Sequence, residues 1–375
     1  MRGSTRLDNA MRAIDSWIEP EGVTGAAIVV RHRGELIAER YAGNGQPDLP
    51  VTERTLFALA SVTKPVTASA VMALVDDGLL AIDEPVARFL PEFATDAPDG
   101  DSRWEASRRS ITVRQALCHT TGLPEDLPQG TLRARDLPSL DTITDHLIRL
   151  PLAFEPGTEL RYSNAGYALL GRLAQRITGR DIWDYSRSRI LEPMGLSDIV
   201  ARPPASDDDR IAHVAEAGGA GTEHESYQSR YWREMAIAWG GIFGSARDIA
   251  LFAESFMLPT NAPLSRPTRA MMITDQAAGV SGGLTSLNLT WHPAHWGLGW
   301  EVKGSKRRHW TGELTSPATY CHWGAAGTFV WADPTQELTV AMFGNRSTYN
   351  LWPFTPIARW ARLSNAIIAA MDPGS

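Results

Sequence analysis

The sequence contains few of the residues that mark several large classes of protein. Its two cysteines, Cys118 and Cys321, stand in no CxxC or other metal-ligand spacing among 375 residues. A disulfide between them has no support, and two free thiols in a reducing compartment are expected. The net charge is −7, which argues against a nucleic acid partner and leaves no polybasic patch for a membrane. No run of about 18 apolar residues exists, so a membrane-spanning helix is excluded.

Lysine is scarcer still. Lys64, Lys303 and Lys306 are the only lysines, so the remaining 33 of the 36 basic residues are arginines. Each lysine therefore stands out, because arginine replaces lysine as a surface charge but not as a base. We expect Lys303 and Lys306 to lie with the neighbouring arginines on a solvated hairpin tip.

Common catalytic signatures are also absent. The sequence contains no GxSxG, GxxxxGK[ST], GxGxxG or HExxH motif, so α/β-hydrolase, nucleotide-binding and zinc peptidase interpretations have no support. The nine histidines show no metal-ligand spacing, and we expect no metal or organic cofactor. No apolar segment follows the first residues, which favours a cytoplasmic protein without a signal peptide.

The order of the elements predicts an α/β (α+β) fold. Strands are expected at 25–30, 36–41, 297–302, 319–324, 327–332 and 337–344, and helices at 5–18, 61–80, 112–118, 141–149, 164–178, 181–191, 246–257 and 355–371. A long polar loop is expected at 203–230. Because strands occur near both chain ends, we expect one antiparallel sheet built from both ends and flanked by helices. The expected domains are 1–84 with 271–375, and a mostly helical insertion at 85–270.

One candidate nucleophile precedes a predicted helix, in Ser61-Val62-Thr63-Lys64. Residues three apart share a helix face, so the amine of Lys64 can reach the hydroxyl of Ser61. Serine is a weak nucleophile and needs a base, and lysine can supply one if burial lowers its pKa. Taken alone, the motif fits a helix N-cap with a solvated lysine better than a catalytic pair.

Two further motifs accompany it. Tyr162-Ser163-Asn164 opens a predicted helix and supplies a phenol and an amide. His322-Trp323-Gly324-Ala325 begins a predicted strand, where a glycine often marks the close approach of a ligand to the backbone. In isolation these motifs also fit a buried tyrosine and a bulged core strand. His119 is interpreted as a structural loop histidine, and most of the 13 tryptophans as core residues.

Together, in this order, the three motifs resemble those of the serine β-lactamase and penicillin-binding-protein superfamily. The resemblance is to its class C β-lactamase-related, family VIII carboxylesterase branch, and it extends over about residues 10–345. It implies a β-lactamase-like fold with the active site in the cleft between the two domains. It also implies that Ser61 is acylated, that Lys64 is the base or tunes it, and that Tyr162 relays protons. Asn164 would contact substrate, and the backbone N–H groups of Ser61 and Ala325 would form an oxyanion hole.

The third motif departs from the family pattern. Lys-Thr-Gly is usual there, whereas His322-Trp323-Gly324 stands here. A histidine is only partly charged at neutral pH, and tryptophan is bulky, so both changes disfavour penicillin-like anions. Trp323 would contact the acyl group.

The resemblance implies a serine hydrolase that cleaves short or medium-chain carboxylic esters of small molecules, with room for weak β-lactamase activity. The alternatives are a β-lactam or peptide-like amide hydrolase of the D-aminopeptidase or linear-amide type, an acyltransferase on the same site, and a non-catalytic binding module. An intact serine, lysine and tyrosine disfavour the binding module. The sequence does not fix the oligomeric state, nor which of Lys64 and Tyr162 is the acylation base.

Overall fold

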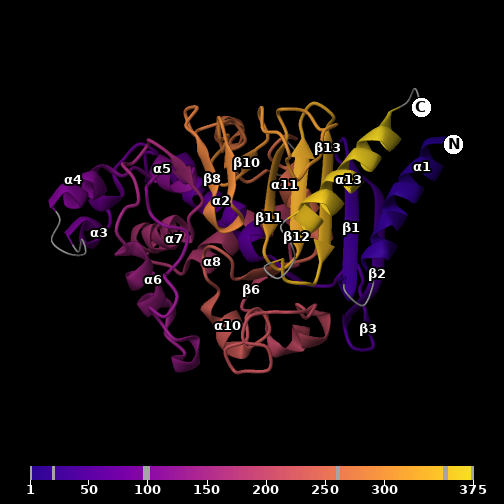
Figure 1. Ribbon diagram of the computed structural model, residues 1–375, viewed down its shortest axis with the longest axis horizontal. Coiled ribbons are helices and arrows are strands. Elements are labelled where there is room, and N and C mark those ends of the chain that lie inside the picture. The colour runs from indigo at the N-terminus through magenta and orange to yellow at the C-terminus, as the bar shows by residue number, and fades with distance from the viewer. Residues whose placement is uncertain (1, 19–21, 96–101, 259–261, 349–353, 373–375) are drawn as a thin grey trace.

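A seven-stranded antiparallel sheet dominates the computed structural model, which describes residues 2–18, 22–95, 102–258, 262–348 and 354–372 (Figure 1). The strand order is β10-β11-β12-β13-β1-β2-β3. The strands are β1 (Gly25–His32), β2 (Glu35–Gln46), β3 (Leu49–Pro50), β10 (Glu301–Val302), β11 (Tyr320–Gly324), β12 (Thr328–Asp333) and β13 (Leu338–Gly344). The central pair β13–β1 joins the two ends of the chain, which confirms the expected mixed α/β fold.

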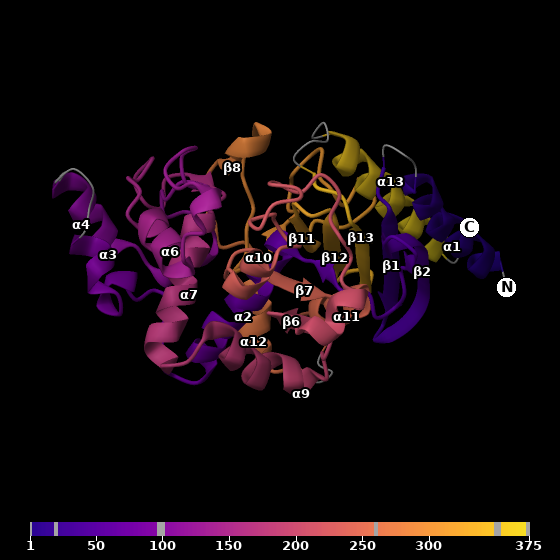
Figure 2. The same cartoon turned by 90° about the horizontal axis from the view of Figure 1, so that it is seen from below.

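Both faces of the central strand β1 are buried over residues 25–30, and the alternating directions of its side chains show how. Ala26, Ile28 and Val30 pack beneath α1 (Arg2–Met11) and α13 (Phe354–Met371), which lie side by side. Ala27 and Val29 point to the opposite face, toward α11 (Ala246–Glu254). Figure 2 shows α11 and α13 on opposite sides of the strands. Successive side chains of a strand point to opposite faces, so a doubly covered strand is apolar throughout.

The remaining helices form the other half of the molecule. They are α2 (Thr63–Asp76), α3 (Pro91–Thr95), α4 (Ser102–Ser110), α5 (Val113–Leu117), α6 (Leu140–Ile148), α7 (Asn164–Thr178), α8 (Ile182–Ser186), α9 (Glu192–Met194), α10 (Arg230–Met235) and α12 (Arg266–Met272). No described helix is long and apolar enough to cross a membrane. The helix predicted at 181–191 is α8 followed by a π-helical turn, Arg187–Leu191. The division at residues 84/85 and 270/271 stays a prediction, and α11 packs on the large sheet although it lies within the expected helical insertion.

The structure also contains two small three-stranded sheets. One has the order β4 (Phe57–Ala58), β7 (Ile242–Gly244) and β6 (Ile199–Ala201). The other contains β5 (Leu160–Arg161), β8 (Gly282–Leu284) and β9 (Leu289–Trp291). Because β4 leads into α2 and β5 leads into α7, these sheets set where the first two motifs begin.

The prediction for two of the three lysines was wrong, whereas Lys64 is buried as a catalytic base requires. Lys303 and Lys306 are buried, 7% and 5% exposed, rather than on a solvated tip, and Lys64 is fully buried. Each ammonium has hydrogen-bond acceptors to replace water: Lys303 donates to Gly312 O and Thr315 Oγ1, and Lys306 to His295 O and Glu301. Basic clusters usually mark solvated surface, but a compact ammonium surrounded by acceptors can be buried. The two cysteines are free, as expected, and both are buried.

Candidate active site

Ser61 lies where β4 ends and the central helix begins. A single 3-10 turn, Ala60–Val62, carries it into α2, whose residues from Thr63 to Leu74 are all buried. A helix that is apolar on all sides lies inside the protein, which is why the first turn of α2 is removed from water. Ala60 has φ of +44°, a conformation that costs energy for a residue with a Cβ. The half-buried Ser61 side chain thus stands at a strained strand-to-helix corner.

The side-chain nitrogen of Lys64 is surrounded by three oxygen atoms. Its Nζ lies 3.0 Å from Ser61 Oγ, 2.8 Å from Asn164 Oδ1 and 2.8 Å from the carbonyl oxygen of Trp239. Burial holds the pKa of Lys64 well below its ordinary value, although the carboxylates of Glu125 and Asp126 partly oppose this shift. The site therefore contains a buried amine within hydrogen-bond distance of a serine.

The second motif enters from the start of α7. The side chain of Ser163 caps this helix by accepting the N–H of Gly166 at 3.0 Å, which directs Tyr162 and Asn164 to the same end. Lys64 Nζ lies 4.7 Å from the centroid of the Tyr162 ring. The structure brings Ser61, Lys64, Tyr162 and Asn164 together although one hundred residues separate the two motifs.

The third motif lies directly against the backbone that precedes Ser61. A Cβ added at Gly324 would meet the carbonyl oxygen of Leu59 at 2.2 Å, so a glycine is required for this approach. The hydroxyl of Thr328 on the next strand donates to the same carbonyl at 2.9 Å. These contacts hold β11, with Ala325 just after it, beside the turn that carries Ser61.

His322 is a neutral group in this environment. Its Nδ1 lies 2.9 Å from the carbonyl oxygen of Trp323, which can only accept, so Nδ1 carries the proton. Burial and the nearby Lys64 lower the pKa of His322 to about 3. Its Nε2 is buried and has no hydrogen-bond partner in the described part of the chain. His322 thus presents an unprotonated acceptor, where the family pattern has a cation.

Tyr162 and His322 share an aromatic cluster with two residues that the sequence did not assign to the site. The ring centroid of His119 lies 4.6 Å from that of Tyr162 and 4.8 Å from that of Trp296. Trp296 lies 5.8 Å from Tyr162 and 6.1 Å from His322. His119 Nδ1 accepts the N–H of Ser163 at 3.0 Å, consistent with a structural role. Trp296 stands in a tryptophan-rich stretch, but nothing in that stretch distinguishes it from core tryptophans.

Two other contributions were missed. The carbonyl oxygen of Trp239 belongs to the turn before Gly241, where an added Cβ would lie 2.1 Å from Ile237 N. The Gly240-Gly241 pair indicates a turn in the sequence, but it does not indicate that the carbonyl oxygen of Trp239 contacts Lys64. Glu125 and Asp126 lie beside Asn164, whose Nδ2 donates to Asp126 Oδ2 at 3.4 Å. Neither Glu125 nor Asp126 belongs to one of the three motifs, so the sequence did not point to them.

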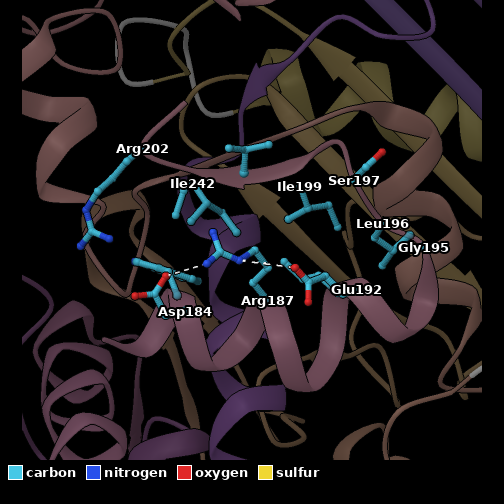
Figure 3. A pocket seen from close by; sticks show the side chains of 13 residues that line it. Asp184, Arg187, Glu192, Gly195, Leu196, Ser197, Ile199, Arg202 and Ile242 are labelled. Atoms are coloured by element: carbon cyan, nitrogen blue, oxygen red, sulfur yellow. Dashed lines mark hydrogen bonds and ion pairs between the residues drawn. The ribbon is translucent and has the colours of Figure 1, made fainter. Parts of the chain in front are cut away.

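A cavity of about 440 Å³ lies elsewhere, between the π-helical turn and β6 (Figure 3). Arg187 lies at its centre, paired with Asp184 at 3.1 Å and with Glu192 at 3.6 Å. None of its lining residues belongs to the three motifs. The remaining charged lining residue, Arg202, pairs with Asp181 outside the cavity at 2.9 Å, and we assign the cavity no role in the reaction.

A buried amine beside a serine, with a tyrosine and a glycine-containing strand around them, is the arrangement that the sequence predicts for a serine hydrolase of the Ser-x-x-Lys type. The family described as Beta-lactamase matches residues 12–359, and the chain belongs to this family. Its members are serine hydrolases that include esterases and peptidases.

Individual relatives carry different names. A protein of Escherichia coli strain K12, provisionally named a D-alanyl-D-alanine carboxypeptidase, is 27% identical over 389 residues, which cover 93% of this chain and 83% of that protein. Esterase EstB of Burkholderia gladioli is 34% identical over 209 residues, 52% of this chain and 50% of the esterase. The crystal structure of a family VIII carboxylesterase shares the fold, with a TM-score of 0.78 at 22% identity, covering 99% of this chain and 98% of that chain.

Proposed function

We propose that this protein is a carboxylesterase that cleaves short or medium-chain esters of small molecules through an acyl-Ser61 intermediate. The observation that carries the proposal is the environment of Lys64 Nζ. A neutral amine has two N–H groups and one lone pair. Asn164 Oδ1 and Trp239 O accept the two N–H groups, which leaves the lone pair for the hydroxyl of Ser61, 3.0 Å away.

The reaction follows from this arrangement. The hydroxyl proton of Ser61 moves to Lys64 Nζ as Oγ forms a bond to the ester carbonyl carbon. The backbone N–H groups of Ser61 and Ala325 receive the negative oxygen of the tetrahedral intermediate. The bond to the alkoxide leaving group then breaks, and Tyr162 passes the proton to that oxygen, which releases the alcohol. Water, deprotonated through the same groups, attacks the acyl-enzyme and releases the acid.

The preference for neutral esters rests on His322. A β-lactam or a peptide with a free C-terminus presents a carboxylate, whose burial requires a cation or several N–H donors. The neutral His322 supplies no cation for such a group, and its unprotonated Nε2 has no N–H to donate. An uncharged ester carries no such penalty.

Glu125 and Asp126 favour one second candidate. Both carboxylates act on Lys64 from beside Asn164, so they also attract a substrate that carries a free amine. An amide or ester of an amino acid with a free amino group fits this arrangement. The name of the Escherichia coli relative favours peptide-like substrates as well.

Three chromogenic substrates separate these possibilities: p-nitrophenyl butyrate, a D-amino acid p-nitroanilide and a chromogenic cephalosporin. Each is assayed with the wild type and with Ser61→Ala. The carboxylesterase proposal requires that the butyrate ester has the highest kcat/KM and that Ser61→Ala abolishes its turnover. Faster turnover of the anilide would select the second candidate. Ester hydrolysis that survives in Ser61→Ala would refute the acyl-serine mechanism.

A further inference from the structure

A buried carboxylate lies directly behind the third motif. Glu301 of β10 pairs with Cys321 of β11, the residue before His322, and is 1% exposed. Its Oε1 accepts from Lys306 Nζ at 2.8 Å and lies 3.2 Å from His309 Nε2, and its Oε2 accepts from Trp310 Nε1 at 2.8 Å. Burying such a charge is costly, and a buried ion pair often stabilises a fold less than apolar residues would. A role in the neighbouring site would account for it better than stability does.

Glu301, Lys306, His309 and Trp310 form a network with two arms. The first arm runs from Glu301 through Lys306 and Trp296 to Tyr162, on the proton-relay side of the site. Lys306 Nζ lies 5.3 Å from the ring centroid of Trp296, and it donates to the carbonyl oxygen of His295 at 2.7 Å. The ammonium therefore holds both the backbone before Trp296 and the face of its indole. The same indole packs against Tyr162 and His322. Glu301 fixes the position of Lys306, so it acts on Tyr162 through two intermediate side chains.

The second arm runs from Glu301 through Trp310 to Trp323, on the acyl side of the site. The hydrogen bond from Trp310 Nε1 to Glu301 orients an indole whose centroid lies 5.5 Å from that of Trp323. Trp291 packs edge-on against Trp310 at 5.9 Å and lies under Lys306 Nζ at 4.6 Å. The half-buried Trp323 is the only residue of this stack within the third motif. One carboxylate is thus connected to both aromatic walls.

A metal site is the competing interpretation. Glu301, His309 and Cys321 place ligand atoms within 4.8 Å of one another. However, the ammonium of Lys306 already bonds to Glu301 and supplies the positive charge that a metal ion would bring. Burial also raises the pKa of the Cys321 thiol, which disfavours the thiolate that a metal requires. The donor set therefore fits an ion-pair network.

We propose that Glu301 is a positioning residue for the active site: through Lys306 it holds Trp296 against Tyr162, and through Trp310 it holds Trp323. The inference rests on the proposed function for the roles of Tyr162 and Trp323. It predicts that the two arms can be separated, because different side chains carry them.

The first arm is tested by the double variant Glu301→Gln with Lys306→Met, which removes both charges and leaves no unpaired one. Lys303→Met is the matched control, because Lys303 is an equally buried lysine three residues away whose Nζ bonds lie outside the aromatic cluster. We expect the double variant to lose about tenfold or more in kcat for p-nitrophenyl acetate, as misplaced catalytic groups typically do. Lys303→Met should remain within about threefold of the wild type.

The second arm is tested by Trp310→Phe, which keeps an aromatic ring and removes the N–H that bonds Glu301. We expect kcat for the acetate ester to change less than about threefold, while KM for the butyrate ester rises about fivefold or more, since the longer acyl chain contacts Trp323. Near-ultraviolet circular dichroism should change in Trp310→Phe and in the double variant but not in Lys303→Met.

Two outcomes would overturn the proposal. The first is a double variant with wild-type kcat and a wild-type near-ultraviolet spectrum but a lowered melting temperature, which would make the network purely structural. The second is an equal loss of kcat in Lys303→Met. Labelling of Ser61 by a fluorophosphonate probe, measured in every variant, reports on the nucleophile without an ester substrate. Wild-type protein that is labelled but inactive on both esters would reject the proposed function, and the labelling rates would still decide the role of Glu301.

Discussion

The exchange of Lys64 for arginine isolates the part of the mechanism that a positive charge cannot supply. Three oxygen atoms surround the nitrogen of Lys64 at 2.8–3.0 Å, and Lys64→Arg puts a planar, permanently protonated group in this space. Without a lone pair the variant cannot take the proton of Ser61. Loss of a general base typically costs about 10²–10⁴-fold. We expect kcat/KM for p-nitrophenyl butyrate to fall by about 10³-fold, which corresponds to about 4 kcal/mol.

The pH profile carries the same information. Burial lowers the pKa of Lys64, so its amine is unprotonated in a range where an ordinary lysine is charged. As the pH falls through this lowered pKa, protonation removes the lone pair and kcat/KM should fall; in Lys64→Arg the residual rate should lack this acid limb. Lys303→Arg controls for the insertion of a guanidinium at a buried lysine. If Lys64→Arg folds and retains kcat/KM within tenfold of the wild type, Lys64 is an electrostatic anchor and the base is another group.

Three further substitutions test other parts of the structure. Gly324→Ala should lower kcat/KM by about 10²-fold in steady-state assays, because its Cβ would lie 2.2 Å from Leu59 O and push β11 away from Ser61. Asp248→Asn should raise the free energy of unfolding by about 2 kcal/mol at pH 8 but not at pH 4, measured in urea. Burial raises the pKa of Asp248 to about 6, so wild-type stability falls as the pH rises from about 4 to 6, where the unfolded chain ionises first. His322→Lys should raise the cephalosporin-to-butyrate rate ratio about tenfold, because it restores a cation to the third motif; an unchanged ratio would remove His322 from substrate selection.

The parts of the fold that could be predicted are those in which one local pattern determines the outcome. The nearly continuous apolar runs in β1 and β13 fit strands covered on both faces, and Ser163 followed by a periodic run fits the capped start of α7. The strand predicted at 297–302 is only two residues long. A Cβ at Gly299 would lie 2.4 Å from the side chain of Ala68 on α2, and φ is +91° there, so the close packing of this segment on α2 interrupts the strand.

In the site, too, the features set by a local pattern could be predicted, and those set by the tertiary fold could not. Ser61 and Lys64 could be paired from the sequence because helical spacing brings them together, whatever the rest of the chain does. The carbonyl oxygen of Trp239 could not, since every residue has a carbonyl and only the tertiary fold selects one. The burial of Lys306 could not be predicted from the sequence for a related reason. It lies in a basic run, and its carboxylate partner becomes visible only when β10 pairs with β11.

The scarcity of lysine leads to a final prediction, for Lys303. Of 36 basic residues three are lysines, and all three are buried, where a single nitrogen meets acceptors of the protein. A guanidinium is larger and spreads its donors over a planar fork, so it cannot replace an ammonium among closely spaced acceptors. Lys303→Arg should therefore lower the free energy of unfolding by about 1–3 kcal/mol, the usual cost of overpacking, while the folded fraction retains its kcat. The substitution Arg230→Lys, at an exposed position, should change the free energy of unfolding by less than about 0.5 kcal/mol. Equal stabilities of the two variants in urea would show that composition alone, rather than the shape of the buried acceptor sites, decides where this chain has lysine.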